Sequence, residues 1–302
     1  MNRWWTYQKE RFPLIAHAPL IAAFSACAVS FSSLIAGAPV PGWKSYLVAF
    51  GVCLLMFLQL RIADEFKDAE EDARWRPYRP VPRGLIKLSE LRWVFIGAAI
   101  IQAALALWLD ARLLIVLGIA WTYLALMSFE FFCRDWLKKR PVIYLFSHMG
   151  IMPLVDFFGT ACEWMPRSQE SHPPSGLLWF LAASFFNGIV IEFGRKLRQP
   201  ADEEEGVETY SALWGKETAF TCWTLAMFVT LGCAGMASAS TGIPAATIGF
   251  LTLLLLAAFF TGARYVQGTL SGKKLELISG IWTLALYLLL GLIPLWIFHH
   301  HA

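Results

Sequence analysis

Apolar residues along the chain fall in runs of about 20, separated by short polar segments. A helix of about 20 apolar residues is long enough to cross the roughly 30 Å hydrocarbon core of a bilayer. No segment has the alternating pattern that is typical of membrane barrel strands. The pattern therefore predicts about nine transmembrane helices, near 12–37, 43–69, 86–109, 111–131, 141–162, 175–198, 216–240, 242–268 and 273–297.

Composition supports this interpretation. Of the 302 residues, 57% are hydrophobic and 16% are charged, and the mean hydropathy is +0.54. A soluble domain does not need so much apolar sequence for one core. No linker longer than about 15 residues separates the predicted helices. We therefore expect an all-α, multi-pass integral membrane protein with a single domain over residues 1–302, surrounded by membrane lipids.

Lysine and arginine are distributed unequally between the two sides of the predicted bundle. If the N-terminus is cytoplasmic, 22 of the 25 basic residues lie on that side, and only Lys44, Arg112 and Arg167 lie on the other. Such a bias predicts orientation. We expect a bacterial cell membrane with the active site facing the cytoplasm. The net charge of +3 then reflects topology, and nothing in it indicates a nucleic-acid partner.

The first candidate site follows the second predicted helix. Asp64, Asp68 and Asp72 recur every four residues, which places them along one face if the helix continues. Aligned carboxylates repel one another unless a cation neutralises them. Oxygen ligands of this kind suit Mg²⁺, which one or two carboxylates commonly hold together with substrate phosphate oxygens.

Prolines and arginines come directly after this acidic row. Pro77, Pro80 and Pro82 should end the helix, and Arg76 and Arg79 offer fork-shaped donors that suit phosphate. Metal and arginine on opposite sides would clamp a diphosphate. The alternative is an ordinary solvated helix end whose arginines only follow the positive-inside bias; the acidic spacing alone does not separate the two, and the prolines and arginines favour phosphate binding.

A second polar constellation follows the sixth predicted helix. It contains carboxylates such as Glu192 and Asp202 where the helix meets the cytoplasm, and Gly206, which permits a turn. Two acidic helix ends on the same membrane face are able to share a metal site.

Together the two motifs resemble those of the UbiA superfamily of intramembrane prenyltransferases. The run DxxxDxxxD followed by RPxRPxPxG, residues 64–84, resembles the first signature, usually NxxxDxxxD with the same downstream pattern. Asp202, Gly206 and Thr209 resemble the end of the second signature, DxxxDxxxGxxT. The order of the motifs, their separation and the nine helices also match, so the resemblance covers nearly the whole chain.

The resemblance implies roles for individual residues. Asp68 and Asp72 match the two aspartates of the first signature, Asp64 stands where the family usually has asparagine, and Asp202 matches the later aspartate of the second. By resemblance, all four would hold Mg²⁺, and Asp68, Asp72 and Asp202 would be catalytic. Arg76 and Arg79 would bind the diphosphate.

Two features depart from the family pattern or match it only loosely. Arg198 stands where the second signature has its earlier aspartate, a change of two charge units; we expect it to bind the diphosphate directly. The loop with Lys138 and Lys139 lies where the family has basic diphosphate-binding residues, although ordinary anchoring at the membrane surface is an equal alternative. The Tyr/Lys pair usual in that region is not recognisable.

Several polar residues fall inside the predicted helices, namely Glu130, His148, Asp156, Asn187 and Glu192. Ionisable residues at membrane depth usually face a cavity or a partner. His148 and Asp156 are eight residues apart, so they should share a helical face and could orient or deprotonate an acceptor. An interhelical hydrogen bond is an equal alternative for His148.

The resemblance implies a reaction. Mg²⁺ and arginine would neutralise the diphosphate of a prenyl diphosphate as its carbon–oxygen bond breaks, and a small aromatic or lipophilic acceptor would capture the allylic cation. A terpene cyclase of the same fold, which needs no acceptor, and a non-catalytic member of the fold are the alternatives.

Overall fold

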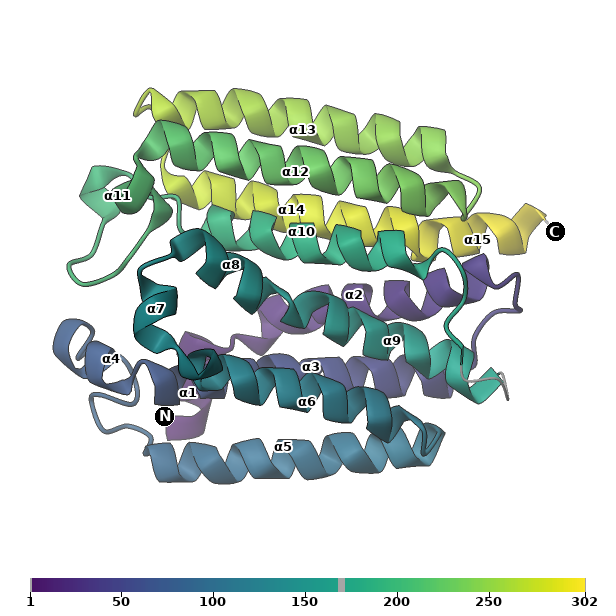
Figure 1. Ribbon diagram of the computed structural model, residues 1–302, viewed down its shortest axis with the longest axis horizontal. Helices are drawn as coiled ribbons and strands as arrows, with labels where there is room; N and C mark the ends of the chain where they lie inside the picture. Colours follow the sequence, from purple (N-terminus) through teal and green to yellow (C-terminus); the bar gives the residue numbers. More distant parts are fainter. Residues whose placement is uncertain (1, 168–171, 302) are drawn as a thin grey trace. The chain divides into compact units, whose positions relative to one another are not determined.

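The computed structural model describes residues 2–167 and 172–301, and within these residues the chain is helical, without strands (Figure 1). Contacts divide the chain into two compact units. The first comprises Met1–Val29 and Pro41–His172, and the second comprises Ser30–Val40 and Pro173–Ala302. Helix α2 (Leu14–Ile35) contributes residues to both. The single domain over 1–302 stays a prediction.

In the first unit α3 is central, because it packs against α5, α6 and α9. The acidic motif lies at the end of α3, followed by the short α4. The helices of this unit besides α2 are α1 (Arg3–Arg11), α3 (Trp43–Lys67), α4 (Ala69–Trp75), α5 (Leu88–Leu109), α6 (Leu113–Ser128), η1 (Glu130–Phe132), α7 (Arg134–Lys138), α8 (Pro141–Met149) and α9 (Ile151–Arg167).

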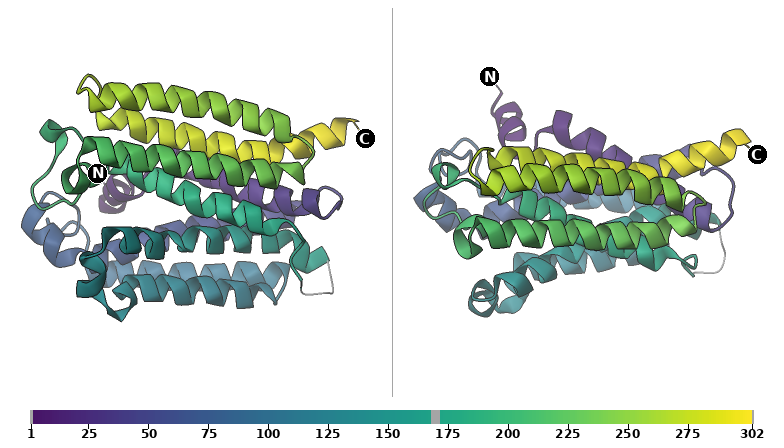
Figure 2. Two further views of the ribbon diagram at one scale, coloured as in Figure 1. Left: turned by 45° about the horizontal axis from the view of Figure 1, so that its top comes forward. Right: turned by 90° about the horizontal axis from the view of Figure 1, so that it is seen from above.

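In the second unit α10 packs against α12 and α14, while α13 covers both α12 and α14. The views from the front and from above show these long helices side by side (Figures 1 and 2). The helices are α10 (Leu177–Arg195), η2 (Pro200–Asp202), α11 (Tyr210–Trp214), α12 (Lys216–Ala239), α13 (Pro244–Val266), α14 (Gly272–Leu290) and α15 (Leu292–His301). The second signature lies in the connection from α10 to α11.

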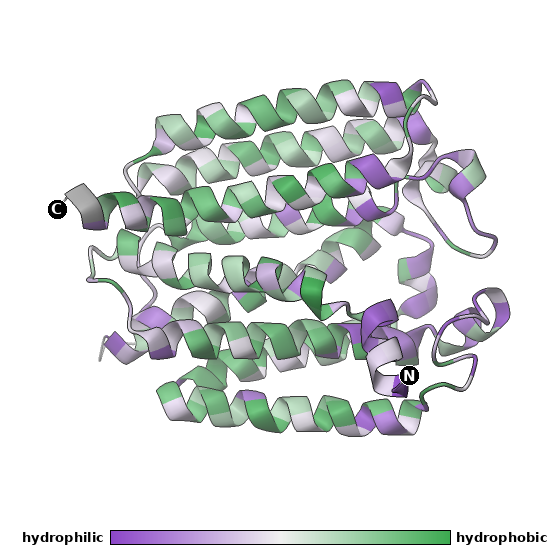
Figure 3. Cartoon of the chain, turned by 180° about the vertical axis from the view of Figure 1, so that it is seen from behind, coloured by the Kyte–Doolittle hydropathy of each residue, from purple (hydrophilic) through white to green (hydrophobic). Residues whose placement is uncertain are grey.

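Eight helical segments of the described chain are long and apolar enough to cross a membrane. In each unit, hydrophilic residues gather at one end of the helices, beside α4 and α7 in the first and beside α11 in the second (Figure 3). The protein is an all-α, multi-pass integral membrane protein. The fourth predicted span coincides with α6, whose 16 residues measure only about 24 Å, so the count of nine is not established.

The fifth predicted span contains an interruption. Helix α8 ends at Met149 and α9 begins at Ile151, with Gly150 between them. The Tyr123 hydroxyl on α6 donates a 2.6 Å hydrogen bond to the Ser147 carbonyl, a group that a continuous helix would use for its own backbone. The expectation that His148 and Asp156 share one helical face is therefore wrong, because the two residues lie on different helices.

Candidate functional site

The acidic motif occupies the junction between α3 and α4. Asp68 stands between the two helices, with φ −96° and ψ 8°. Backbone hydrogen bonds of 2.9 Å from Asp68 to Asp64 and of 2.8 Å from Asp72 to Asp68 continue across the junction. The helical hydrogen bonds therefore pass through Asp68, although its ψ departs from the helical value and divides α3 from α4. Each of the three carboxylates has a different environment.

Asp72 is buried and paired with arginine. Its side chain is 3% exposed, its Oδ2 accepts a 2.7 Å hydrogen bond from Arg79, and its Oδ1 lies 3.3 Å from the Arg76 guanidinium. Helix α4 ends at Trp75, directly before these arginines and the prolines. The structure therefore brings one carboxylate of the motif together with Arg76 and Arg79 of the Arg–Pro loop, residues 76–84.

Basic side chains neutralise Asp64 and Asp68 less than they neutralise Asp72. The Asp64 side chain is 42% exposed and lies 3.5 Å from Arg61 and 3.8 Å from Lys67. Within the described residues, Asp68 makes no side-chain hydrogen bond or ion pair. Burial raises the pKa of Asp68, and the negative charges of Asp64, Asp72 and Glu71 raise it further against the opposing effect of Lys67. A cation placed beside Asp68 would relieve this repulsion.

The donor chemistry of this motif fits Mg²⁺. No group of three or more His, Cys, Asp or Glu side chains in the described ranges is close enough to hold a metal by itself. Mg²⁺ does not need such a group, because one or two carboxylates and the phosphate oxygens of a substrate commonly suffice. Asp64 and Asp68 are the carboxylates most available for it, since Asp72 is engaged by its arginines.

Helix α7 contacts the acidic helix through Glu71, which the sequence analysis did not single out. Lys138 donates a 2.5 Å hydrogen bond to Glu71, and Arg134 donates one of 3.3 Å. The hydrogen bond from Lys138 lowers the pKa of Glu71. Lys139 is exposed. Of the two lysines predicted to bind the diphosphate, Lys138 therefore lies beside α4, and its hydrogen bond to Glu71 connects α7 with α4.

Helix α1 holds the motif from another side. Arg11 pairs with the buried Glu65 of α3, and Glu10 accepts a 2.9 Å hydrogen bond from Arg83 of the Arg–Pro loop. Tyr7 is buried in a core cluster with Ile62 and residues of the segment after the loop. The N-terminal helix thus fixes both the end of α3 and the Arg–Pro loop.

A second polar cluster of the first unit lies where α6 ends. Lys67 donates a 3.0 Å hydrogen bond to the Tyr144 hydroxyl, which donates one of 3.1 Å to Glu130, and His148 lies beside Glu130. A pocket of about 200 Å³ opens here, lined by Lys67, Ser128, Phe129, Glu130 and Arg134. Lys67 and Tyr144 are 77 positions apart, so spacing in the sequence carried no signal of their contact.

In the second unit, hydrogen bonds to its backbone fix the position of Arg198. Its N–H donates a 2.8 Å hydrogen bond to Ser211, and its carbonyl accepts one of 2.7 Å from Tyr265. The guanidinium lies 3.5 Å from Glu276, near the start of α14. Arg198, which stands where the family pattern has an aspartate, therefore has a carboxylate partner, Glu276, within its own unit.

The rest of the second motif forms a turn that side-chain hydrogen bonds stabilise. Asp202 is exposed in η2. Thr209 donates hydrogen bonds of 2.7 Å to Glu203 and caps α11 by accepting from the Ala212 N–H at 3.1 Å. Gly206 adopts a positive φ of 73°, which a side chain would disfavour. Arg198 and Asp202 both precede this turn, and Asp202 ends η2 four positions after Arg198.

The model of the UbiA prenyltransferase family matches residues 22–271, which include both motifs and their connecting helices. The chain belongs to the UbiA prenyltransferase family. Among curated proteins, none matches the sequence.

Solved structures of UbiA proteins share the fold. The apo structure of a UbiA homologue from Aeropyrum pernix K1 gives a TM-score of 0.67 at 13% identity, over 92% of this chain and 98% of that one. A structure of a digeranylgeranylglyceryl phosphate synthase gives 0.57 at 19% identity, over 95% and 98%. At these identities the likeness shows the fold alone.

UbiA membership supports intramembrane prenyl transfer or a related activity on a prenyl diphosphate, in isoprenoid biosynthesis. Members of the family generally use Mg²⁺ with diphosphate substrates.

Proposed function

We propose that this protein transfers an isoprenyl group from a prenyl diphosphate to a small lipophilic or aromatic acceptor within the membrane, with Mg²⁺, on the cytoplasmic side of a bacterial cell membrane. The observation that supports this most directly is the first motif itself. It places two weakly neutralised carboxylates, Asp68 one turn and Asp64 two turns before Asp72, the buried carboxylate that holds Arg76 and Arg79.

The arrangement suits a diphosphate for a physical reason. Arg76 and Arg79 are held near their working position by Asp72, so less side-chain entropy is lost when they bind phosphate oxygens. Bound Mg²⁺ would supply neutralisation of the charge that develops on the leaving diphosphate. Asp64 and Asp68 would hold it, and Asp72 would join them once its arginines turn to the phosphates. Lys138 would reach the same phosphates from α7.

For the second motif we propose that Arg198 binds the diphosphate directly and that Asp202 contributes to metal binding. The backbone of Arg198 is fixed by Ser211 and Tyr265, while its side chain is only loosely paired with Glu276 at 3.5 Å. A guanidinium so placed can exchange a carboxylate partner for a phosphate at low cost.

The test is pyrophosphate release by the purified protein in nanodiscs, with geranyl, farnesyl and geranylgeranyl diphosphates, with and without Mg²⁺, and with and without a membrane lipid extract as the source of the acceptor. We expect Mg²⁺-dependent release that falls about 100-fold in Asp68→Asn, because a charge that stabilises the transition state is lost. Asp135→Asn is the matched control, since Asp135 is exposed on α7. Release that persists in Asp68→Asn, or that needs no Mg²⁺, would contradict the proposal.

A further inference from the structure

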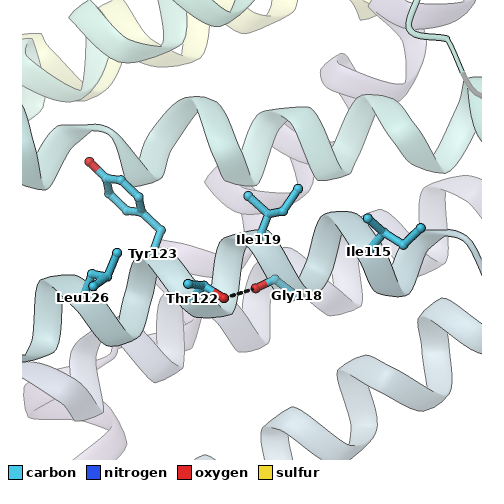
Figure 4. A pocket seen from close by; sticks show the side chains of 6 residues that line it. All are labelled: Ile115, Gly118, Ile119, Thr122, Tyr123 and Leu126. Atoms are coloured by element: carbon cyan, nitrogen blue, oxygen red, sulfur yellow. Dashed lines mark hydrogen bonds between the residues drawn. The ribbon is translucent and has the colours of Figure 1, made fainter.

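In the described part of the chain, the side chains that line an apolar groove along α6 have no hydrogen-bond donor left for a ligand (Figure 4). The Thr122 hydroxyl donates a 2.8 Å hydrogen bond to a backbone carbonyl, and the Tyr123 hydroxyl donates one of 2.6 Å to another. The groove has a volume of about 440 Å³ and is lined by Ile115, Gly118, Ile119, Thr122, Tyr123 and Leu126. Such a surface suits the chains of the surrounding lipid and selects no particular ligand.

The side-chain amide of Gln199, in contrast, lies at the centre of a hydrogen-bonded cluster next to Arg198. Its Nε2 donates hydrogen bonds of 2.8 Å to the Tyr265 carbonyl and of 2.7 Å to the Leu270 carbonyl. Its Oε1 accepts one of 3.3 Å from Lys216. Both amide hydrogens and the amide oxygen are thus used, so the side chain is held in one orientation.

The cluster joins several elements at one end of the second unit. The last carbonyls of a helix lack the usual helical donors, and at the end of α13 Gln199 donates to the carbonyl of Tyr265. Lys216, the first residue of α12, donates a 3.3 Å hydrogen bond to the carbonyl of Val266. Leu270 lies in the connection from α13 to α14. Gln199 therefore ties the segment after α10 to the start of α12, the end of α13 and the connection to α14.

The contact between this cluster and Arg198 runs in both directions. The buried Tyr265 donates a 2.7 Å hydrogen bond from its hydroxyl to the Arg198 carbonyl, while its own carbonyl accepts from Gln199. On the other side, the Arg198 N–H is bonded to Ser211 at 2.8 Å. Peptide units are planar, so hydrogen bonds to the units on both sides of Arg198 fix its φ and ψ and the direction in which its side chain leaves the backbone.

We propose that Gln199 and Tyr265 are positioning residues for Arg198. Their role rests on the proposed binding of the diphosphate by Arg198 and adds the groups that aim its guanidinium. The Glu276 carboxylate, 46% exposed and 3.5 Å away, restrains that guanidinium only weakly. The backbone cluster therefore does most to limit the positions that the guanidinium reaches, and this lowers the entropy lost when it binds phosphate oxygens.

The test measures binding, so that no turnover is needed. The purified protein in nanodiscs is titrated with geranyl, farnesyl and geranylgeranyl thiolodiphosphates in the presence of Mg²⁺, by calorimetry. We expect Arg198→Ala to raise the Kd about 30-fold, because a charge-assisted hydrogen bond is lost. Gln199→Leu and Tyr265→Phe should each raise it about 10-fold, because the guanidinium is then less well preorganised.

A double-mutant cycle separates positioning of Arg198 from general support of the fold. In the Arg198→Ala background, Gln199→Leu and Tyr265→Phe should change the Kd less than about two-fold, because no guanidinium remains to be positioned. Equal weakening with and without Arg198 would show that the two residues act on binding by another route, and would overturn the proposal. Tyr265→Phe keeps the buried ring, so it guards against a folding defect in Gln199→Leu.

Matched controls remove the same groups outside the cluster. Gln267→Leu changes an exposed glutamine directly after α13. Tyr287→Phe removes a buried hydroxyl of α14 that bonds Ser184 at 3.3 Å. Both variants should bind the thiolodiphosphates like wild type, even where their melting temperature falls.

The outcomes distinguish this inference from the proposed function. Unchanged affinity in Gln199→Leu and Tyr265→Phe, with weaker binding in Arg198→Ala, would overturn the positioning role and leave Arg198 as a ligand of the diphosphate. If Arg198→Ala binds like wild type, the role of Arg198 fails and its positioning fails with it. A wild type that binds none of the three thiolodiphosphates would contradict the proposed prenyl transfer itself, together with the roles that rest on it.

Discussion

At the scale of single residues, the three aspartates of the first motif differ in the charged side chains that surround them. Asp72 has two arginines, Asp64 has a loosely placed arginine and lysine, and Asp68 has Lys67 and three other carboxylates around it. Residues of the same type at the same spacing are thus suited to different tasks: one to hold arginines, the others to attract a cation.

The first prediction concerns Arg79. A lysine there keeps the charge but loses the planar fork that bonds Asp72 at 2.7 Å and suits phosphate, so Arg79→Lys should raise the KM for the prenyl diphosphate about 10-fold. Steady-state pyrophosphate release measures this. Arg74→Lys, at an exposed arginine of α4 whose guanidinium lies over Trp75, is the control. An unchanged KM in Arg79→Lys would count against diphosphate binding by this loop.

A second prediction concerns the opposite end of α5, where Asp110 accepts hydrogen bonds from Arg112 that lower its pKa. A carboxyl whose pKa is lower in the folded state stabilises the protein above its unfolded pKa of about 4 and loses that effect as pH falls through the folded value. Asp110→Asn should therefore cost about 1 kcal/mol of stability, equally at pH 5 and pH 8.

Apparent melting temperatures of wild type and Asp110→Asn in detergent, compared between pH 5 and pH 8, test this. A difference that grows steadily over this range would assign the effect to another titrating group. Asp135→Asn on α7 gives the baseline for removal of an exposed aspartate.

Among the contacts of the candidate site, the sequence could predict those between residues that are close together in the chain. Asp64, Asp68, Asp72 and the following arginines are close in sequence, so their proximity was foreseeable. Glu71 with Lys138, Lys67 with Tyr144, and Arg198 with Glu276 are pairs from distant elements. Only the packing of helices decides such contacts, and one sequence carries no period that reveals them.

At the scale of elements, helix ends and interruptions determine where these groups lie. Arg198 is one residue beyond Leu197, whose carbonyl oxygen would lie 1.7 Å from a Cβ added at Gly272, the first residue of α14. Such a close approach between two backbones admits only glycine. The start of α14 therefore supports the segment that carries Arg198.

The third prediction follows from this approach. Gly272→Ala should destabilise the protein by about 2 kcal/mol or more, since the obstacle is backbone and cannot rotate away. Gly280→Ala in the same helix should be neutral or slightly stabilising, because its Cβ would meet nothing within 4 Å and alanine is the better helix former. Thermal unfolding in detergent compares the two. Equal melting temperatures would contradict the tight contact between α14 and the Arg198 segment.

The elements themselves were predictable to different degrees. Long apolar runs identified the spans because the bilayer demands about 20 apolar residues. Their interruptions were not foreseen. Gly150 separates α8 from α9 where the Tyr123 hydroxyl takes a backbone carbonyl, a contact that hydropathy does not register. Asp68, with a ψ of 8°, separates α3 from α4 within one continuous polar segment.

At the scale of the whole molecule, the described part of the chain has eight segments long and apolar enough to cross a membrane, and the basic residues of the sequence are unevenly distributed between their ends. Hydropathy predicted the multi-pass architecture, and the family match supports the fold. Orientation stays a prediction from charge alone, which rests on the retention of basic residues on the cytoplasmic side during insertion.

The fourth prediction is that Lys44 faces outward and Lys138 faces the cytoplasm. Both side chains are exposed, so single cysteines there should react with a membrane-impermeant maleimide. A suitable background replaces only Cys133 and Cys222 with serine, because the other four cysteines, Cys27, Cys53, Cys162 and Cys233, are buried. Lys44→Cys should be labelled in intact cells, and Lys138→Cys only after the membrane is permeabilised.

The pattern of labelling decides the side of the membrane on which the proposed diphosphate site lies. Lys138 bonds Glu71 beside the acidic motif, so a maleimide that reaches residue 138 from a given side reports the side of Asp68 as well. Labelling of Lys138→Cys in intact cells with protection of Lys44→Cys would invert the orientation. The proposed site would then open on the side opposite the cytoplasm. A prenyl diphosphate made in the cytoplasm could not reach Arg76 and Arg79 without first crossing the membrane.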